Sequence, residues 1–251
     1  MRPFVARLSY DEETAAAYEA VREIPRDGLS EWREAIRRHL HPSPGMTLVD
    51  VGAGTGQFSI AFSDWFELEV VAVEPSAAMR GRIPRKKGVR VLEGVAGDVP
   101  LPDESADAAW LSLVIHHIPD LTAAAREIRR VLRPGAPVLI RQGFPGRLAG
   151  VELVRWFPET TRAVETYPSV TATCDAFAAA GLQMDALEQV RETYPTSLAD
   201  FLGQLDTLRD ADTTLRGLSD DEFLRGKERL RRAVRQNPEP RSNRLDLLVL
   251  R

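Results

Sequence analysis

Short apolar runs alternate with helix-prone segments along the first part of the chain. The run TLVDV at residues 47–51 is almost continuously apolar, and only Asp50 interrupts it. Four further runs lie at residues 68–74, 89–92, 107–115 and 136–141. Parallel strands that are covered on both faces read as continuous apolar runs, and helical crossovers join them. The pattern therefore predicts an open α/β sheet, whose ligands bind at the carboxyl ends of its parallel strands.

Two helices are predicted ahead of this sheet. Residues 11–21 are rich in alanine, and residues 30–40 carry an apolar stripe of Trp32, Ile36 and Leu40. We expect both helices to pack in front of the loop that follows the first strand.

The last third of the chain is less regular. It opens with an aromatic, proline-punctuated insertion at residues 144–170. Ser219 and Glu222 have the spacing of a capping box, which marks the start of a helix. The elements predicted after the insertion are, in order, a helix at 175–180, a strand at 183–192, helices at 197–208 and 219–235, and a strand at 244–250.

Composition narrows the class of partner. The chain has 251 residues, 43% hydrophobic and 28% charged, with a net charge of -4 and a pI near 5.7. This balance gives no electrostatic footprint for nucleic acid or an anionic membrane, so a small-molecule partner is expected. Cys174 is the single cysteine and the chain has only four histidines, so no metal site is expected. The sequence has no apolar signal segment, so a cytoplasmic protein is expected. It does not decide between a monomer and a homodimer.

A glycine-rich turn follows the first strand. Gly52, Gly54 and Gly56 occupy every second position, which lets the backbone turn sharply and approach a ligand closely. A dinucleotide-binding turn would place its third glycine at position 57, which is Gln57 here. Glu74, at the end of the second strand, could accept hydrogen bonds from the ribose hydroxyls of either a dinucleotide or an adenosyl cofactor, so it does not discriminate between them.

Several segments in a fixed order resemble the class I S-adenosylmethionine-dependent methyltransferases. VDVGAGTGQFS at 49–59 resembles the first motif of that family, and VVAVEPSAAM at 70–79 resembles its ribose-binding segment. The segment at 94–120 is similar to the adenine segment and fourth strand, and REIRRVLRPGAPVLI at 126–140 to the motif before the fifth strand. The resemblance implies a Rossmann-like, doubly wound, seven-stranded and mostly parallel sheet with an antiparallel last strand at one edge, plus helical lid insertions.

The resemblance also implies the cofactor, S-adenosyl-L-methionine, and the product, S-adenosyl-L-homocysteine. The glycines would lie under the methionine portion, Glu74 on the ribose and the segment from Leu111 onward near the methionine ammonium. Many relatives carry an adenine-binding acid where this chain has Val95 and Gly97, so Asp98 or backbone groups of the loop would replace it. The residues expected to bind the cofactor are Gly52, Gly54, Gly56, Glu74, Pro75, Met79, Ala96, Gly97, Asp98, Leu111, Tyr18 and Arg22.

Methyl transfer depends mainly on positioning, although a hydroxyl or ring-nitrogen acceptor benefits from a general base. His116 and His117, beyond the fourth strand, are the candidate bases, and Tyr10 is a further catalytic candidate that would also help Tyr18 and Arg22 to close the cofactor pocket. The predicted acceptor pocket comprises Trp156, Phe157 and Tyr167, for which a place in a local core is the alternative.

A single methyltransferase domain spans residues 1–251 in this interpretation. Its parts are N-terminal lid helices at 1–45, a cofactor-binding core at 46–142, acceptor-side insertions at 143–170 and 196–241, and the C-terminal part of the sheet at 171–195 and 242–251. The expected acceptor is an aromatic or indole-like intermediate of bacterial secondary metabolism, methylated on carbon, nitrogen or oxygen. The alternatives are a noncatalytic or non-methylating S-adenosylmethionine-binding protein of the same fold, and an RNA or protein methyltransferase.

Overall fold

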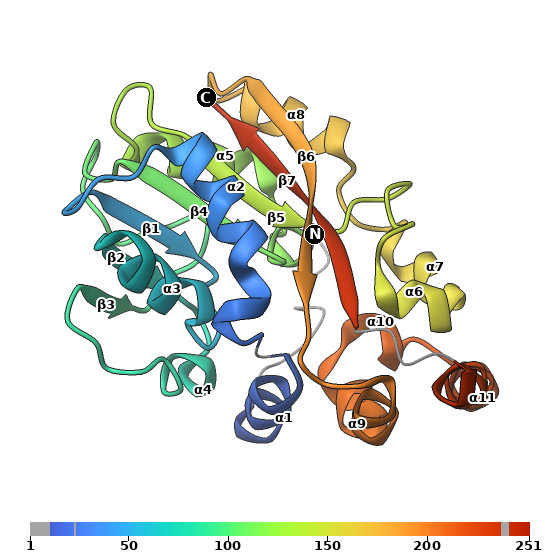
Figure 1. Cartoon of the computed structure of the whole chain (residues 1–251). Helices are drawn as coiled ribbons and strands as arrows, with labels where there is room; N and C mark the ends of the chain where they lie inside the picture. The colour runs from blue at the N-terminus through green and yellow to red at the C-terminus, as the bar shows by residue number, and fades with distance from the viewer. Residues whose placement is uncertain (1–10, 23, 237–240) are drawn as a thin grey trace.

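A seven-stranded sheet organises the computed structural model, which describes residues 11–22, 24–236 and 241–251 (Figure 1). The strand order is β3-β2-β1-β4-β5-β7-β6. The strands are β1 (Thr47–Val51), β2 (Glu69–Val73), β3 (Val89–Leu92), β4 (Ala108–Ser112), β5 (Val138–Gln142), β6 (Met184–Thr193) and β7 (Ser242–Leu250). The fold class predicted from the sequence is confirmed.

The last strand is antiparallel, as expected, but it does not lie at the edge. β7 pairs with β5 on one side and with β6 on the other, antiparallel to both. Leu248, Val249 and Leu250 have apolar neighbours in both ladders, and Leu247 to Leu250 are completely buried. A strand this apolar is stabilised by cover on both edges and both faces, so the more polar β6 takes the edge.

One face of the sheet is covered by α2 (Ser30–Leu40) and α3 (Gln57–Phe66). Trp32 of α2 and Phe58 of α3 both contact the Trp110 ring of β4, with centroids 6.1 and 4.8 Å away. The expectation that α2 packs in front of the glycine loop is therefore wrong. The apolar stripe of α2 packs against the sheet, including β6. Its side chains Trp32, Ile36 and Leu40 are all buried there.

The other face is covered by α5 (Leu121–Val131) and α8 (Val170–Ala178), which contribute Ile128, Val131 and Phe177 to the core. α8 begins five residues before the helix predicted from the sequence. Its first turn is capped by Ser169, whose hydroxyl accepts a hydrogen bond from the Ala172 amide.

A helical unit, here called the lid, stands beyond the carboxyl ends of the strands (Figure 1). It joins the insertion to the later helices through one apolar core that includes Phe157, Leu205, Leu215 and Phe223. The capping box predicted at Ser219 and Glu222 is present. The lid helices are α6 (Glu152–Trp156), α7 (Thr161–Val164), α9 (Leu198–Ala211), α10 (Thr213–Arg216) and α11 (Asp220–Gln236).

The helix α1 (Glu12–Arg22) lies beside α9 and also contacts α4 (Ala77–Arg80) after β2 (Figure 1). Short 3-10 turns complete the fold at Arg26–Leu29, Ile115–His117 and Pro158–Thr160. Within the described ranges, no helix is both long enough and apolar enough to cross a membrane.

Candidate active site

The glycine turn between β1 and α3 is closed at both ends and open in the middle. Gly52, Gly54 and Gly56 have φ angles of 74°, 56° and 82°, which glycine adopts without strain. A Cβ on Gly52 would lie 2.4 Å from Val114, and one on Gly56 would lie 2.7 Å from Ile83, whereas one on Gly54 would have nothing within 4 Å. The turn therefore packs tightly at Gly52 and Gly56. At Gly54 its backbone is uncovered, and a ligand can approach it there.

Glu74 fixes this turn to the end of β2. Its Oε2 accepts a hydrogen bond from the Gly54 amide and its Oε1 accepts one from the Ser76 amide, both at 2.9 Å. Burial raises the pKa of Glu74, and the two amides oppose that rise. The Glu74 carboxyl group therefore lies at the carboxyl end of β2, where the resemblance requires the ribose-binding acid.

Asp50 is a site residue that the sequence analysis did not single out. It is 2% exposed, lines the central cavity and accepts a hydrogen bond of 2.5 Å from the Ser59 hydroxyl. Burial raises the pKa of Asp50 to about 7, against the Ser59 hydrogen bond and with a smaller contribution from the nearby Glu74 charge. The available signal was an acid that interrupts an otherwise apolar strand.

A cavity of about 230 Å³ lies between the carboxyl edge of the sheet and the lid. Asp50 and the glycine turn line one end, and side chains from α6, α9 and α10 line the other. The cavity therefore joins the expected cofactor site to the lid. Its apolar lining includes Ile24, Phe58, Leu113, Leu148, Val164 and Leu245.

Four strand ends meet in a buried polar group on the cavity wall, here called the strand-end network (Ser112, Arg141, Glu192, Asn243). Arg141 pairs with Glu192 across β7 and donates to the Ser112 hydroxyl at 3.1 Å. Glu192 also accepts from Asn243 Nδ2 at 2.8 Å and from the Tyr194 hydroxyl at 2.9 Å. Burial alone would raise the pKa of Glu192, but the Arg141 charge and these donors lower it. Glu192 is therefore an ionised, saturated structural group and a poor proton acceptor.

A second buried pair lines the same cavity. Arg241 donates to Glu152 through Nη2 at 2.7 Å and to the Thr196 hydroxyl at 2.8 Å. Its guanidinium lies over the rings of Tyr194 and Phe201, 4.6 and 4.0 Å from their centroids. Both arginines of the cavity thus carry a carboxylate partner, and the wall is polar without a large net charge.

His116 and His117 lie in the 3-10 turn after β4 and both line the cavity. Their ring centroids are 4.2 Å apart, and the His116 ring also stacks on Tyr167 at 4.1 Å with an interplanar angle of 12°. Tyr167 comes from the insertion, and its hydroxyl lies 3.2 Å from that of Thr213 in the lid. The two candidate bases and this predicted pocket residue are therefore brought together.

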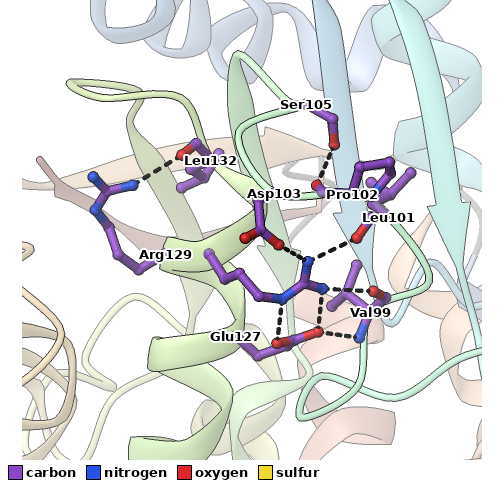
Figure 2. Close-up of polar contacts among 9 residues, drawn as sticks. Val99, Leu101, Pro102, Asp103, Ser105, Glu127, Arg129 and Leu132 are labelled. Carbon is purple, nitrogen blue, oxygen red and sulfur yellow. Dashed lines mark hydrogen bonds and ion pairs between the residues drawn. The ribbon is translucent and has the colours of Figure 1, made fainter.

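The loop after β3, which carries the predicted adenine-binding residues Ala96, Gly97 and Asp98, is anchored to α5. Glu127 accepts a hydrogen bond from the Val99 amide at 2.9 Å, drawn as a dashed line in Figure 2. Arg130 donates to the carbonyl oxygens of Val99 and Leu101 at 3.1 and 2.9 Å, and pairs with Glu127. The hydrogen bonds from Arg130 lower the pKa of Glu127. Gly97 and Asp98 are exposed, whereas Ala96 packs against the core.

Other predicted cofactor residues lie beneath α1. Met79 is buried with Ala78 against Ala15 and Tyr18, so α1 covers the segment after Glu74, while Pro75 is exposed. Tyr18 also lines the cavity. Tyr10 lies outside the described residues, and the side chain of Arg22 is outside them as well.

Three sequence-based placements need correction. Trp156 and Phe157 do not line the cavity but lie in the core of the lid, where Phe157 packs face to face with Phe223 at 5.7 Å. Burying two such rings inside a separate helical unit stabilises it more than exposing them to a wet pocket would. The Leu111 side chain is completely buried in the sheet core, and its neighbours Ser112 and Leu113 line the cavity instead.

Comparison with known proteins agrees with this geometry. Residues 49–140 match the family model described as "Methyltransferase domain". Over these residues the chain is a class I S-adenosylmethionine-dependent methyltransferase domain, as its sequence motifs predict. The match ends at β5, so the methyltransferase domain model includes the glycine turn, Glu74 and both histidines but none of the lid.

Two curated relatives share only part of their length with this chain. A Caulobacter sp. (strain K31) protein, "Ubiquinone/menaquinone biosynthesis C-methyltransferase UbiE", is 30% identical over 142 residues, 51% of this chain and 56% of that protein. A malonyl-(acyl-carrier protein) O-methyltransferase of Methylococcus capsulatus is 32% identical over 163 residues, 63% of this chain and 56% of that protein. The chain thus aligns with little more than half the length of the curated relatives it matches.

A solved structure shares the whole fold. A protein of Anabaena variabilis, described as a methyltransferase from an antibiotic biosynthesis pathway, superposes with a TM-score of 0.73, covering 91% of this chain and 98% of that chain at 19% identity. The likeness extends to the lid segments that the family model leaves out.

The residues present fit the family's cofactor. Bare backbone at Gly54, a carboxyl group at the end of β2 and a buried acid beside the turn supply the hydrogen-bond acceptors and the close approach that an adenosyl sulfonium needs. Among the described residues, no three His, Cys, Asp or Glu side chains are grouped closely enough to hold a metal ion.

Proposed function

We propose that this protein transfers a methyl group from S-adenosylmethionine to a small-molecule acceptor bound between the sheet edge and the lid. The observation that carries the proposal is that one cavity is lined both by Asp50 and the glycine turn and by lid residues. A cofactor on the turn and an acceptor under the lid would share that cavity without intervening solvent.

The chain's own residues act mainly by positioning. When bound, the cofactor supplies a methyl group already activated on a sulfonium. Gly52 and Gly54 would lie against its methionine portion, Glu74 would accept hydrogen bonds from its ribose, and Asp50 would face its positive charge. The strand-end network and Tyr167 would hold the acceptor in line, where orientation and exclusion of water account for most of the rate.

The wall of the cavity supports an aromatic acceptor that carries polar groups. The rings of Tyr167, Tyr194 and Phe58 suit an aromatic acceptor, and the paired arginines and Gln142 suit one that also carries polar substituents. The curated relatives are named for methylation at carbon and at oxygen, so the methylated atom stays open. The Anabaena neighbour supports secondary metabolism as the setting, and an aromatic natural-product intermediate is our proposed acceptor.

The test is methyl transfer from S-[methyl-³H]adenosylmethionine into a panel of phenols, indoles and quinone precursors. Label should pass into an aromatic compound, with S-adenosylhomocysteine formed in equal amount. Cofactor binding without turnover on the panel would favour a noncatalytic or non-methylating protein of this fold. Label recovered in RNA or protein of a cell lysate would favour a macromolecular acceptor.

A further inference from the structure

Gln142, the last residue of β5, is buried against the His116 ring. Its side chain is 1% exposed, and its Nε2 lies 3.3 Å from the Gly143 carbonyl oxygen and 3.3 Å from His116 Nδ1. Both hydrogens of the amide nitrogen therefore have a neighbour. Gln142 lies outside both the sequence motifs and the family-model match, which ends at residue 140.

The Gly143 carbonyl determines which way the amide faces. A carbonyl oxygen only accepts hydrogen bonds, so the group beside it must be the Gln142 nitrogen. This orientation leaves Gln142 Oε1 without a hydrogen-bond partner within the described part of the chain. The reversed amide would instead place two carbonyl oxygens 3.3 Å apart, and we assign the first orientation on this basis.

The amide orientation in turn decides the protonation state of His116. Because Gln142 Nε2 can only donate, His116 Nδ1 must accept. A neutral imidazole that accepts at Nδ1 carries its proton on Nε2. Tyr167 stacks on the ring and His117 packs against it, which restricts the rotation that would exchange the two nitrogens.

We propose that Gln142 is a positioning residue that holds His116 as the Nε2–H tautomer, so that His116 donates a hydrogen bond to an oxygen of the acceptor and takes no proton from it. The part of this inference that concerns the acceptor rests on the proposed function. It narrows the acceptor to a compound with a carbonyl, enolate or phenolate oxygen next to the methylated atom. His117 is then the remaining candidate base of the pair.

Among the described residues, the titratable side chains whose rings pack on His116 are His117 and Tyr167. The other described titratable groups that line the same cavity are Asp50, Arg141, Glu152, Glu192, Asp212, Arg241 and the phenols of Tyr18 and Tyr194. Among them Arg141 and Arg241 are paired with Glu192 and Glu152, and Asp212 caps α10.

The tautomer can be observed directly by ¹⁵N–¹H correlation NMR on histidine-labelled protein without cofactor or acceptor. The chain has four histidines, and the signals lost in His116→Gln identify this ring. In the wild-type protein, Nδ1 should have the chemical shift of an unprotonated nitrogen and Nε2 that of a protonated one. An Nδ1–H tautomer in the wild-type protein would overturn the proposal.

Two substitutions test the role of Gln142 itself. Gln142→Glu replaces a donor by an acceptor, so it should switch His116 to Nδ1–H and move the ring's titration midpoint to higher pH. Gln142→Leu should leave a mixture of tautomers. Gln189→Glu on β6, which is exposed, is the matched control and should change neither property. If neither Gln142 variant alters the His116 tautomer, the proposal is wrong even if the chain proves to be a methyltransferase.

The acceptor part has its own measurement once a substrate is identified. His116→Asn keeps a side-chain N–H donor, so it should retain more of kcat/KM than His116→Ala, by about 10-fold, with the basic pKa of the pH profile unchanged. Equal losses in both variants, together with loss of that limb of the profile, would identify His116 as a base and contradict the proposal.

Discussion

At the scale of single residues, the site depends on acids held in unusual surroundings. Asp50 and Glu74 are both buried near the glycine turn, and the Glu74 charge adds to the rise in the Asp50 pKa. A positive ligand between them would relieve that repulsion. Two predictions follow from this electrostatic arrangement.

Binding of S-adenosylhomocysteine should depend on the ionisation of Asp50. The ligand keeps an ammonium group, which favours the charged carboxylate, so affinity should rise as pH increases from about 6 to about 8, through the pKa near 7. Asp50→Asn should bind roughly 10-fold more weakly at the higher pH and show a flatter profile. Calorimetric titration across this range is the measurement, and a wild-type profile as flat as that of the variant would contradict the role.

The Asp50 carboxyl should also make the folded state less stable as pH rises, whereas it makes ligand binding stronger. Its folded pKa of about 7 exceeds the ordinary 3.8, so between these values the folded state binds more protons than the unfolded state and stability falls as pH rises. Without ligand, Asp50→Asn should therefore be more stable than wild type at about pH 8 and similar to it near pH 4. Urea denaturation at both values checks this, and greater stability of the wild type at pH 8 would argue against a penalised charge.

The Glu74 side chain should contribute directly to cofactor binding. Glu74→Gln weakens the acceptor for ribose hydroxyls and should raise the Kd for S-adenosylhomocysteine by about 10- to 100-fold, since a hydrogen bond to a charged group contributes about 1.5–3 kcal/mol. Glu69→Gln, at the exposed amino end of the same strand, is the control and should leave the Kd unchanged. Equal affinity of both variants would remove Glu74 from the cofactor site.

At the scale of elements, the lid depends on a close approach between α11 and the end of α6. Gly226 of α11 faces the Phe157 ring, and a Cβ there would lie 2.1 Å from it. Gly203 of α9 has nothing within 4 Å of the same position. The two glycines provide a matched pair for testing how the lid is packed.

Gly226→Ala should destabilise the protein and Gly203→Ala should stabilise it. Alanine gains about 1 kcal/mol of helix propensity at either site, but at Gly226 overpacking costs about 1–3 kcal/mol. Thermal unfolding of both variants is the measurement. An equal gain in Tm would show that the Phe157 ring can move aside and that the contact does not hold the lid together.

At the scale of the whole molecule, the strand-end network connects four strands from two distant parts of the sequence. Arg141 and Glu192 are separated by 51 residues and by β7, and both are almost completely buried. The guanidinium also lies 5.3 Å from the ring centroids of Trp32 and Phe58, so it links the cavity wall to the helices on the sheet.

Removing one partner of this pair should be costly. Glu192→Gln leaves the Arg141 charge uncompensated and should lower the free energy of unfolding by about 3–5 kcal/mol. Glu31→Gln breaks an exposed pair with Arg191, the neighbouring residue on β6, and should cost less than about 1 kcal/mol. Similar small losses in both variants would mean that solvent reaches Arg141.

The sequence by itself determined the sheet, its strand positions and the cofactor turn. In a chain of this size, a short apolar run has few possible structures other than a buried strand. The glycine spacing and Glu74 are local features with local physical causes. The observed strand ends lie within two residues of the predicted ones, except at β4, which stops three residues early, at Ser112, because Leu113 adopts a φ of 54°. No periodicity in the sequence indicates such a left-handed residue.

Only the tertiary structure decided the acceptor side. The position of β7 between β5 and β6, the burial of Trp156 and Phe157 in the lid, and the meeting of Arg141 with Glu192 all depend on contacts between residues far apart in the chain. The sequence does not show whether an aromatic residue or an arginine faces a pocket or a core, because its surroundings are residues that only folding brings close to it. The cofactor turn is formed by consecutive residues, whereas the acceptor pocket is formed by residues that lie far apart in the sequence.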